Sequence, residues 1–86
     1  MDRIENRVQE LHNCSKEELE EKLKYNKDSQ KRVSGEIDSL VIVRDRLGDT
    51  CFDETIHDLD QLYYTLCNEY VNYQINIEAI EKCLHS

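Results

Sequence analysis

Four side chains near the two ends of the chain are of types that bind zinc. His12 and Cys14 precede one long stretch of helical pattern, and Cys83 and His85 end another. Two thiolates and two imidazoles suit a tetrahedral zinc ion, and antiparallel packing of the two stretches would bring both pairs to the same end. Residues two apart on a helix, however, point to nearly opposite sides. Packing and solvent exposure explain these side chains better than zinc does, and we expect no cofactor.

Signatures of catalysis are absent from the sequence. It has no glycine-rich phosphate loop, nucleophile elbow, H-E-x-x-H or C-x-x-C motif. Adjacent acids such as Glu17 and Glu18 fall on expected exposed faces or in first turns, where solvation and the helix dipole account for them. General acid–base catalysis needs such a group in a desolvated cleft. We predict that the protein is not an enzyme.

The cysteines and the hydropathy of the chain bear on its location. The four cysteines, at 14, 51, 67 and 83, are too few for a secreted disulfide framework and indicate reduced thiols. No apolar run reaches the length of about 18 residues that crosses a bilayer. Residues 1–5 lack the apolar core of a signal peptide. We expect a cytoplasmic protein without a membrane partner.

Charge is unevenly distributed and limits the class of partner. Of the net charge of −8, residues 1–47 contribute −1 and residues 48–86 contribute −7, where Lys82 stands against eight acids. Binding of nucleic acid needs a cationic surface. The one basic cluster is interleaved with acids, as on a solvated helix face, and comprises Lys22, Lys24, Lys27, Lys31 and Arg32. We expect no direct binding of nucleic acid.

The strongest pattern is a heptad repeat in the last segment. Apolar residues follow one another there at alternating steps of four and three, at Phe52, Ile56, Leu59, Tyr63, Leu66, Tyr70, Tyr73, Ile77, Ile80 and Leu84. A mean step of about 3.5 residues keeps one narrow stripe facing a neighbouring helix. The hairpin core is expected to consist of Leu59, Tyr63, Leu66, Tyr70, Tyr73, Ile77 and Ile80.

The preceding segment carries a weaker version of this stripe. Read backwards from Gly48, the same spacing selects Leu47, Arg44, Leu40, Ile37, Val33, Gln30, Asn26, Leu23 and Leu19, of which six are apolar. Ser15 and Glu18 match a capping box at its start. The polar stretch 24–32 is its weakest part, since Tyr25 is the only apolar residue there and Asp28 and Ser29 could interrupt the helix.

These patterns predict an all-α chain that forms one domain over residues 1–86. We expect helices at about 2–12, 15–47 and 51–85, with a turn at 48–50. A turn this short makes the two long helices an antiparallel, coiled-coil-like hairpin. The short N-terminal helix either folds back over the open end of the hairpin or runs on into the next helix, and we favour a break between them.

Tyrosines in the stripe of the last helix face polar positions in the preceding one. In a hairpin that turns near residue 49, the numbers of facing residues add up to roughly 98, which sets Tyr73 near Asn26 and Tyr70 near Gln30. A phenol ring fills core volume while its hydroxyl reaches an amide. We predict a tyrosine–amide layer in mid-hairpin. The alternative is that tyrosine merely fills a loosely specified stripe.

A second apolar line, displaced by roughly 100° from the first, follows Tyr64, Cys67, Val71, Ile75 and Ala79 on the last helix. The run Leu40-Val41-Ile42-Val43 likewise points almost all round the helix before the turn. Helices apolar over so wide an arc are covered on more than one side. We therefore predict a three- or four-helix bundle completed by oligomerisation, and a partner interface at Tyr64, Cys67, Val71 and Ile75.

These inferences favour a non-catalytic helical module that binds a protein partner or itself, as a small adaptor or a subunit of a helical assembly. One alternative is an acidic regulator or inhibitor, of phage or host-defence type, that blocks a basic nucleic-acid-binding surface of another protein. It would use acids at Asp53, Glu54, Asp58, Asp60, Glu69, Glu78 and Glu81. A second alternative is a secretion or assembly chaperone.

Overall fold

The computed structural model of the chain describes residues 2–47 and 53–85. Within these ranges the chain forms three helices and no strand: α1 (Arg3–Glu10), α2 (Lys16–Leu47) and α3 (Asp53–Leu84). The all-helical fold expected from the sequence is therefore confirmed. The predicted turn at 48–50, together with Cys51 and Phe52, lies outside the described residues.

Side-chain caps define where the first two helices begin. The amide of Ile4 donates to Asp2 Oδ1 at 2.9 Å, and the amide of Glu18 donates to Ser15 Oγ at 3.2 Å. Each bond satisfies an amide that the first helical turn leaves without a backbone acceptor. The second bond is one of the two that a capping box contains. The chain breaks between α1 and α2, as favoured.

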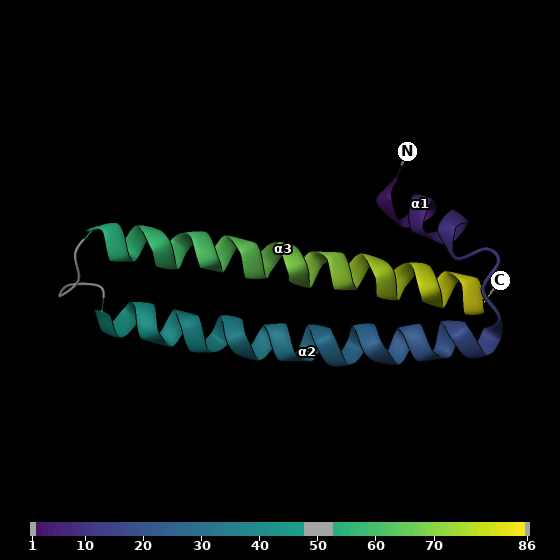
Figure 1. The fold of residues 1–86 in the computed structure, drawn as a ribbon, viewed down its shortest axis with the longest axis horizontal. Coiled ribbons are helices and arrows are strands. Elements are labelled where there is room, and N and C mark those ends of the chain that lie inside the picture. The colour runs from purple at the N-terminus through teal and green to yellow at the C-terminus, as the bar shows by residue number, and fades with distance from the viewer. Residues whose placement is uncertain (1, 48–52, 86) are drawn as a thin grey trace.

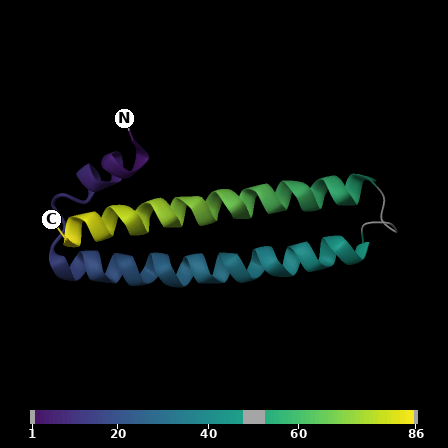
Figure 2. The ribbon, with the colours of Figure 1, turned by 180° about the vertical axis from the view of Figure 1, so that it is seen from behind.

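The two long helices pack side by side and antiparallel (Figures 1 and 2). Side-chain bonds fix their register, since Gln30 pairs with Gln74, Arg44 with Asp60 and Asn26 with Asn76. The residue numbers of these pairs add up to 104, 104 and 102. The predicted total of roughly 98 was therefore wrong. Its physical basis was a three-residue turn, whereas five residues separate the last residue of α2 from the first of α3.

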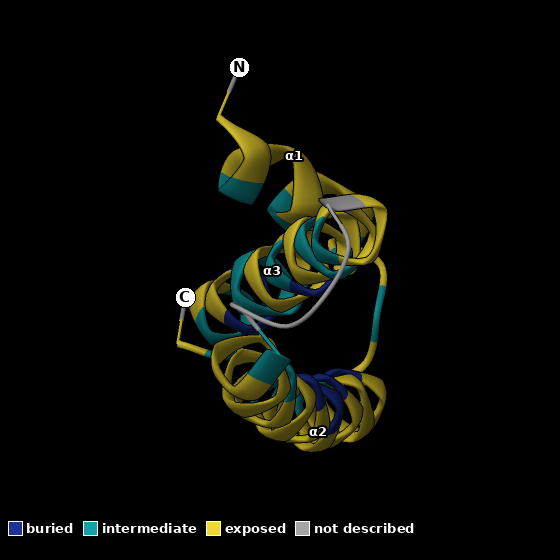
Figure 3. Ribbon diagram, turned by 90° about the vertical axis from the view of Figure 1, so that its left-hand side faces the viewer, coloured by how far each residue is buried: buried dark blue, intermediate teal, exposed yellow. Residues whose placement is uncertain are grey.

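The short helix α1 packs on the C-terminal end of α3, on the side away from α2 (Figures 1 and 2). Viewed end-on, the helices form a row with α3 in the middle (Figure 3). The molecule is correspondingly elongated, 52 Å in its longest dimension and 14 Å in its shortest. As a result, α3 is covered from two sides near its C-terminus and from one side near its N-terminus.

The buried core follows the seam between α2 and α3 and the contact with α1. Its apolar members, among the described residues, are Leu19, Val33, Leu66, Ile77, Ala79 and Ile80. Of the predicted hairpin core, Leu66, Ile77 and Ile80 are buried, Leu59 and Tyr73 are half-buried, and Tyr63 and Tyr70 are exposed at the edge of the seam.

The stretch 24–32 of α2 is continuous helix, and the weak positions Asp28 and Ser29 do not interrupt it. Tertiary packing accounts for this continuity, because Asn26 and Ser29 are buried in this stretch. A small hydroxyl and a satisfied amide fit under α3, so packing outweighs the low helix propensity of these residues.

We expect Ile80→Ala to lower the free energy of unfolding by about 2–5 kcal/mol, because truncation of a buried isoleucine leaves a cavity. Ile80 is only 1% exposed. The matched control is Leu62→Ala, since Leu62 lies on the same helix but is 49% exposed; its cost should stay below about 1 kcal/mol. Urea unfolding followed by circular dichroism measures both. Equal losses would contradict the assignment of the core.

Candidate interaction surface

Apolar exposure is concentrated at one end of the hairpin. We call residues 36–47 of α2 and 53–71 of α3 the turn-proximal half. Among the described residues, the large apolar side chains that are exposed in this half are Val41, Ile42, Val43, Leu62, Tyr63, Tyr64, Tyr70 and Val71. In the other half, Tyr25 alone among the described residues belongs to this class. On α3 the difference follows from the layout, because α1 covers that helix near its C-terminus.

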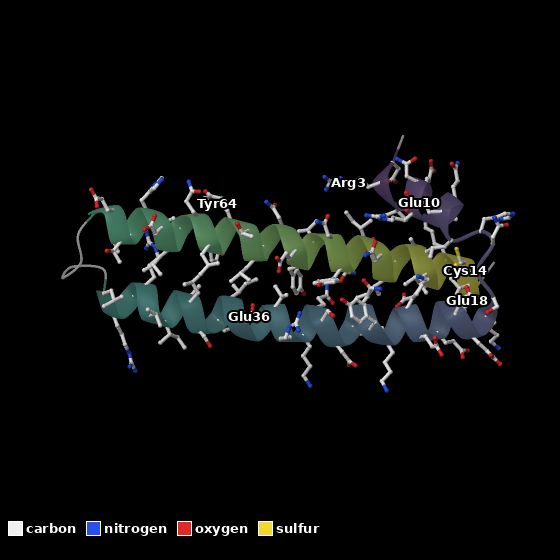
Figure 4. The ribbon with its side chains drawn as sticks, viewed as in Figure 1. Arg3, Glu10, Cys14, Glu18, Glu36 and Tyr64 are labelled. Atoms are coloured by element: carbon white, nitrogen blue, oxygen red, sulfur yellow. The ribbon has the colours of Figure 1, made fainter. Side chains whose placement is uncertain are left out.

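A groove runs along one edge of the seam in the turn-proximal half. Leu40 and Val41 of α2 form one wall, and Tyr63 and Tyr64 of α3 form the other. Its polar rim consists of Arg44, Asp45 and Asp60. Tyr64 is 69% exposed and lies on the part of α3 that α1 does not reach (Figure 4). The rings of Tyr63 and Tyr64 meet edge to face, with centroids 6.3 Å apart, a favourable arrangement of aromatic side chains.

A shallower groove runs along the opposite edge of the same seam. Leu62 and Leu66 of α3 line it, together with Arg32, Gly35, Glu36, Ser39 and Leu40 of α2. The small side chains at 35 and 39 leave this edge open, and a Cβ added at Gly35 would meet nothing within 4 Å. The seam of the turn-proximal half is thus open on both edges.

The predicted partner interface is divided between two environments. Tyr64 and Val71 are exposed and Cys67 is half-buried, whereas Ile75 packs beside α1 residues Arg3, Asn6, Arg7 and Glu10. The division is geometric, because each step of four residues advances about 40° around a helix. The line therefore drifts as it runs along α3. Its C-terminal end, with Ala79 fully buried, is covered by α1, and only its N-terminal part stays open.

Polar residues inside the seam form hydrogen bonds with amide side chains rather than with phenols. Gln30 Nε2 donates to Gln74 Oε1 at 2.7 Å, and Asn76 Nδ2 donates to Asn26 Oδ1 at 3.1 Å. The amide of Asn26 also donates to the backbone oxygen of Lys22. The expected tyrosine–amide layer is thus an amide–amide layer. Sequence reasoning passed over Gln74 and Asn76; the signal was their position next to Tyr73 and Ile77, at the edges of the stripe.

Two interactions give the groove its electrostatic character. Arg44 Nε donates to Asp60 Oδ1 at 2.6 Å, and this hydrogen bond, with the charge of Asp60, raises the pKa of Arg44. Hydrogen bonding to the Cys67 side chain, followed by its charge, raises the pKa of Tyr63 above the ordinary value. An ordinary phenol is already neutral at physiological pH, and this shift acts in the same direction for Tyr63.

The described residues contain no group of three or more His, Cys, Asp or Glu side chains arranged to hold a metal ion. His12, Cys14, Cys83 and His85 are thus not gathered into a zinc site. The Cys83 thiol instead approaches the backbone oxygen of Val8, at 3.9 Å. This contact joins α3 to α1, so Cys83 contributes to packing.

The acids that an inhibitor would present do not form one row. Asp60 is paired with Arg44, and Glu81 lies 3.8 Å from Lys27. At about 100° per residue, Glu54, Asp58 and Glu69 share one side of α3 and Glu78 lies on the far side. The side chain of Asp53 lies outside the described residues. This distribution is typical of charge that keeps a protein soluble.

Comparison with protein-family models, with curated proteins and with solved structures finds no match to this chain. None of the described helices is both long enough and apolar enough to cross a membrane. Functional inference therefore starts from the surface itself.

The amide layer is open to a double-mutant test. Asn76→Leu removes the hydrogen-bond donor to the buried Oδ1 of Asn26, a residue that is 7% exposed. The substitution should lower the free energy of unfolding by about 1–3 kcal/mol. The double variant Asn26→Leu/Asn76→Leu removes both partners, so it should recover most of that loss. Chemical denaturation of the wild type, both single variants and the double variant measures the coupling. Strictly additive effects would show that the two amides do not depend on each other.

Proposed function

We propose that the protein is a non-catalytic helical interaction module whose binding surface is the turn-proximal half of the hairpin. The observation that carries this proposal is the exposure of eight large apolar side chains in that half. Scattered single apolar residues on a surface need no explanation, but the gathering of eight such side chains in one half of a small chain favours a site where another molecule binds.

The layout of the chain supports the same conclusion. α1 covers α3 where Ile75 and Ala79 lie, so a third helix satisfies the apolar arc of α3 at one end. At the other end none of the described elements does so. A helix with an apolar arc this wide is normally covered on more than one side, and a partner supplies that cover here.

Three forms of such a module are distinguishable. An adaptor or assembly subunit forms a lasting complex through the patch, and a chaperone covers a partner's helix with the same patch while remaining monomeric alone. The inhibitor alternative depends on rows of acids, and the pairing of Asp60 and Glu81 within the chain weighs against it. We therefore favour the interaction module over the inhibitor as the function of this protein.

Photo-cross-linking tests the location of the surface. A photoreactive phenylalanine analogue replaces Tyr64 in one variant and Tyr25 in the other, because both tyrosines are well exposed, at 69% and 64%, but lie in different halves. In the cells that naturally make the protein, we expect a discrete cross-linked species from position 64 and none from position 25. A species from position 25 alone, or from neither position, would contradict the proposal.

Light scattering over a concentration series complements this experiment. A molar mass that stays near 10.3 kDa indicates that the cross-linked species contains a different protein. A mass that doubles with concentration indicates a second copy of the chain. Both outcomes are compatible with an interaction module, and they differ in the partner.

A further inference from the structure

We infer that the groove between Val41 and Tyr64 accepts a basic amphipathic helix of another protein, an inference that rests on the proposed function and specifies its partner. The juxtaposition that carries it is an apolar cleft between two helices with an acidic rim. Neither the apolar walls alone nor the charge alone would identify a basic amphipathic helix as the occupant.

The shape of the groove suits a helix. Its walls are formed by α2 and α3, so a third helix laid along the groove would insert its side chains into gaps between theirs. Tyr64 and Val71 stand one heptad apart, at about 10 Å along α3. This spacing matches apolar anchors at positions i and i+7 of a docked helix. The described residues offer no strand edge to which an extended peptide could add.

The charge around the groove indicates which charged side chains a bound helix should carry. The turn-proximal half as a whole carries two arginines against eight acids, a net charge of −6. Of these acids Asp45 and Asp60 line the groove, whereas Glu54, Asp58 and Glu69 lie on the side of α3 away from Tyr63. The one cation on the groove's rim, Arg44, is already paired with Asp60. Asp45 forms no ion pair within the described residues, and heptad spacing sets Asp38 on the same face. Lysines or arginines that flank an apolar stripe would meet these carboxylates.

A second copy of the chain fits the groove less well in either orientation. If two turn-proximal halves faced each other, two surfaces of net charge −6 would be brought together, which opposes association. If the turn-proximal half faced the opposite half of a second copy, its apolar walls would meet the Gln30–Gln74 and Lys27–Glu81 pairs. The first arrangement brings like charges together, and the second buries polar groups against an apolar surface.

Synthetic peptides test this inference directly. Two peptides of about 18 residues, long enough for five turns, share one leucine and alanine stripe and carry lysine or glutamate at all other positions. A third has the lysine composition in an order that abolishes the stripe. Fluorescence anisotropy with the full-length chain should show the lysine peptide binding at least about tenfold more tightly than either of the others. The preference for lysine over glutamate should narrow between about 50 mM and 500 mM salt.

Matched variants locate the binding site. Tyr64→Ser/Val71→Ser should weaken binding of the lysine peptide at least about tenfold, whereas Tyr25→Ser, at the other end of the hairpin, should change it by less than about twofold. Asp45→Asn should reduce the preference for lysine over glutamate, and Asp28→Asn, an exposed acid in the α1-covered half, should leave it unchanged. Circular dichroism confirms that each variant remains helical.

Several results would overturn the inference. These are equal binding of the lysine and glutamate peptides, equal binding of the scrambled peptide, absence of binding, and affinity that survives Tyr64→Ser/Val71→Ser. A chain that dimerises through position 64 would overturn it as well, while the interaction module would stand. Loss of the cross-link at position 64 would instead remove the module itself, so the two failures are distinguishable.

Discussion

A pair of packed helices can bury only one stripe of each partner, and the architecture of this protein follows from that constraint. The heptad stripes of α2 and α3 meet and form the seam that contains Val33, Leu66 and Ile80. Any apolar side chain outside those stripes needs a third element. The chain supplies one, α1, but its eight residues reach only one end of a hairpin built from two 32-residue helices. The structure is therefore a three-helix arrangement at one end and a bare hairpin at the other.

Polar groups in the seam determine how the two long helices are aligned. The pairs Gln30–Gln74 and Asn26–Asn76 are amide to amide, and both lie in the half that α1 covers. A shift by one residue would leave the buried amide of Asn26 and its half-buried neighbours without partners, at a cost of about 1–3 kcal/mol for a fully buried amide. Buried polar residues in coiled coils set register in the same way, at some cost in stability. In the turn-proximal half this task falls to the exposed Arg44–Asp60 pair.

Much of the fold could be predicted from the sequence, because its features are periodic and local. Stripes at steps of three and four give the long helices, and the Ser15–Glu18 cap gives a boundary. The register could not be predicted, since it depends on the length of the connection and on which amide meets which. Asn26 has several candidates within reach of an antiparallel partner, and only coordinates select Asn76 over Tyr73.

The candidate site was predictable in part for a related reason. The second apolar line on α3 is visible in the sequence, and Tyr64 and Val71 on it are exposed. The drift of that line is also implied by its steps of four. An interface that includes Ile75 neglects this drift, because α1 of the same chain packs beside Ile75. The groove itself, with Asp45 and Asp60 on its rim, depends on the register and required the structure.

The position of α1 also has a consequence for the order in which the molecule assembles. One contact between α1 and α3 joins Val8 to Cys83, 75 residues further along the chain. Contacts between such distant residues form late, because the loop between them must close first. During synthesis α1 is made before α2 and α3, yet its docking surface exists only when the C-terminal turns of α3 have been made. Of the three helices, the earliest to be synthesised is therefore the last to dock, and until then the C-terminal half of α3 is as uncovered as its N-terminal half.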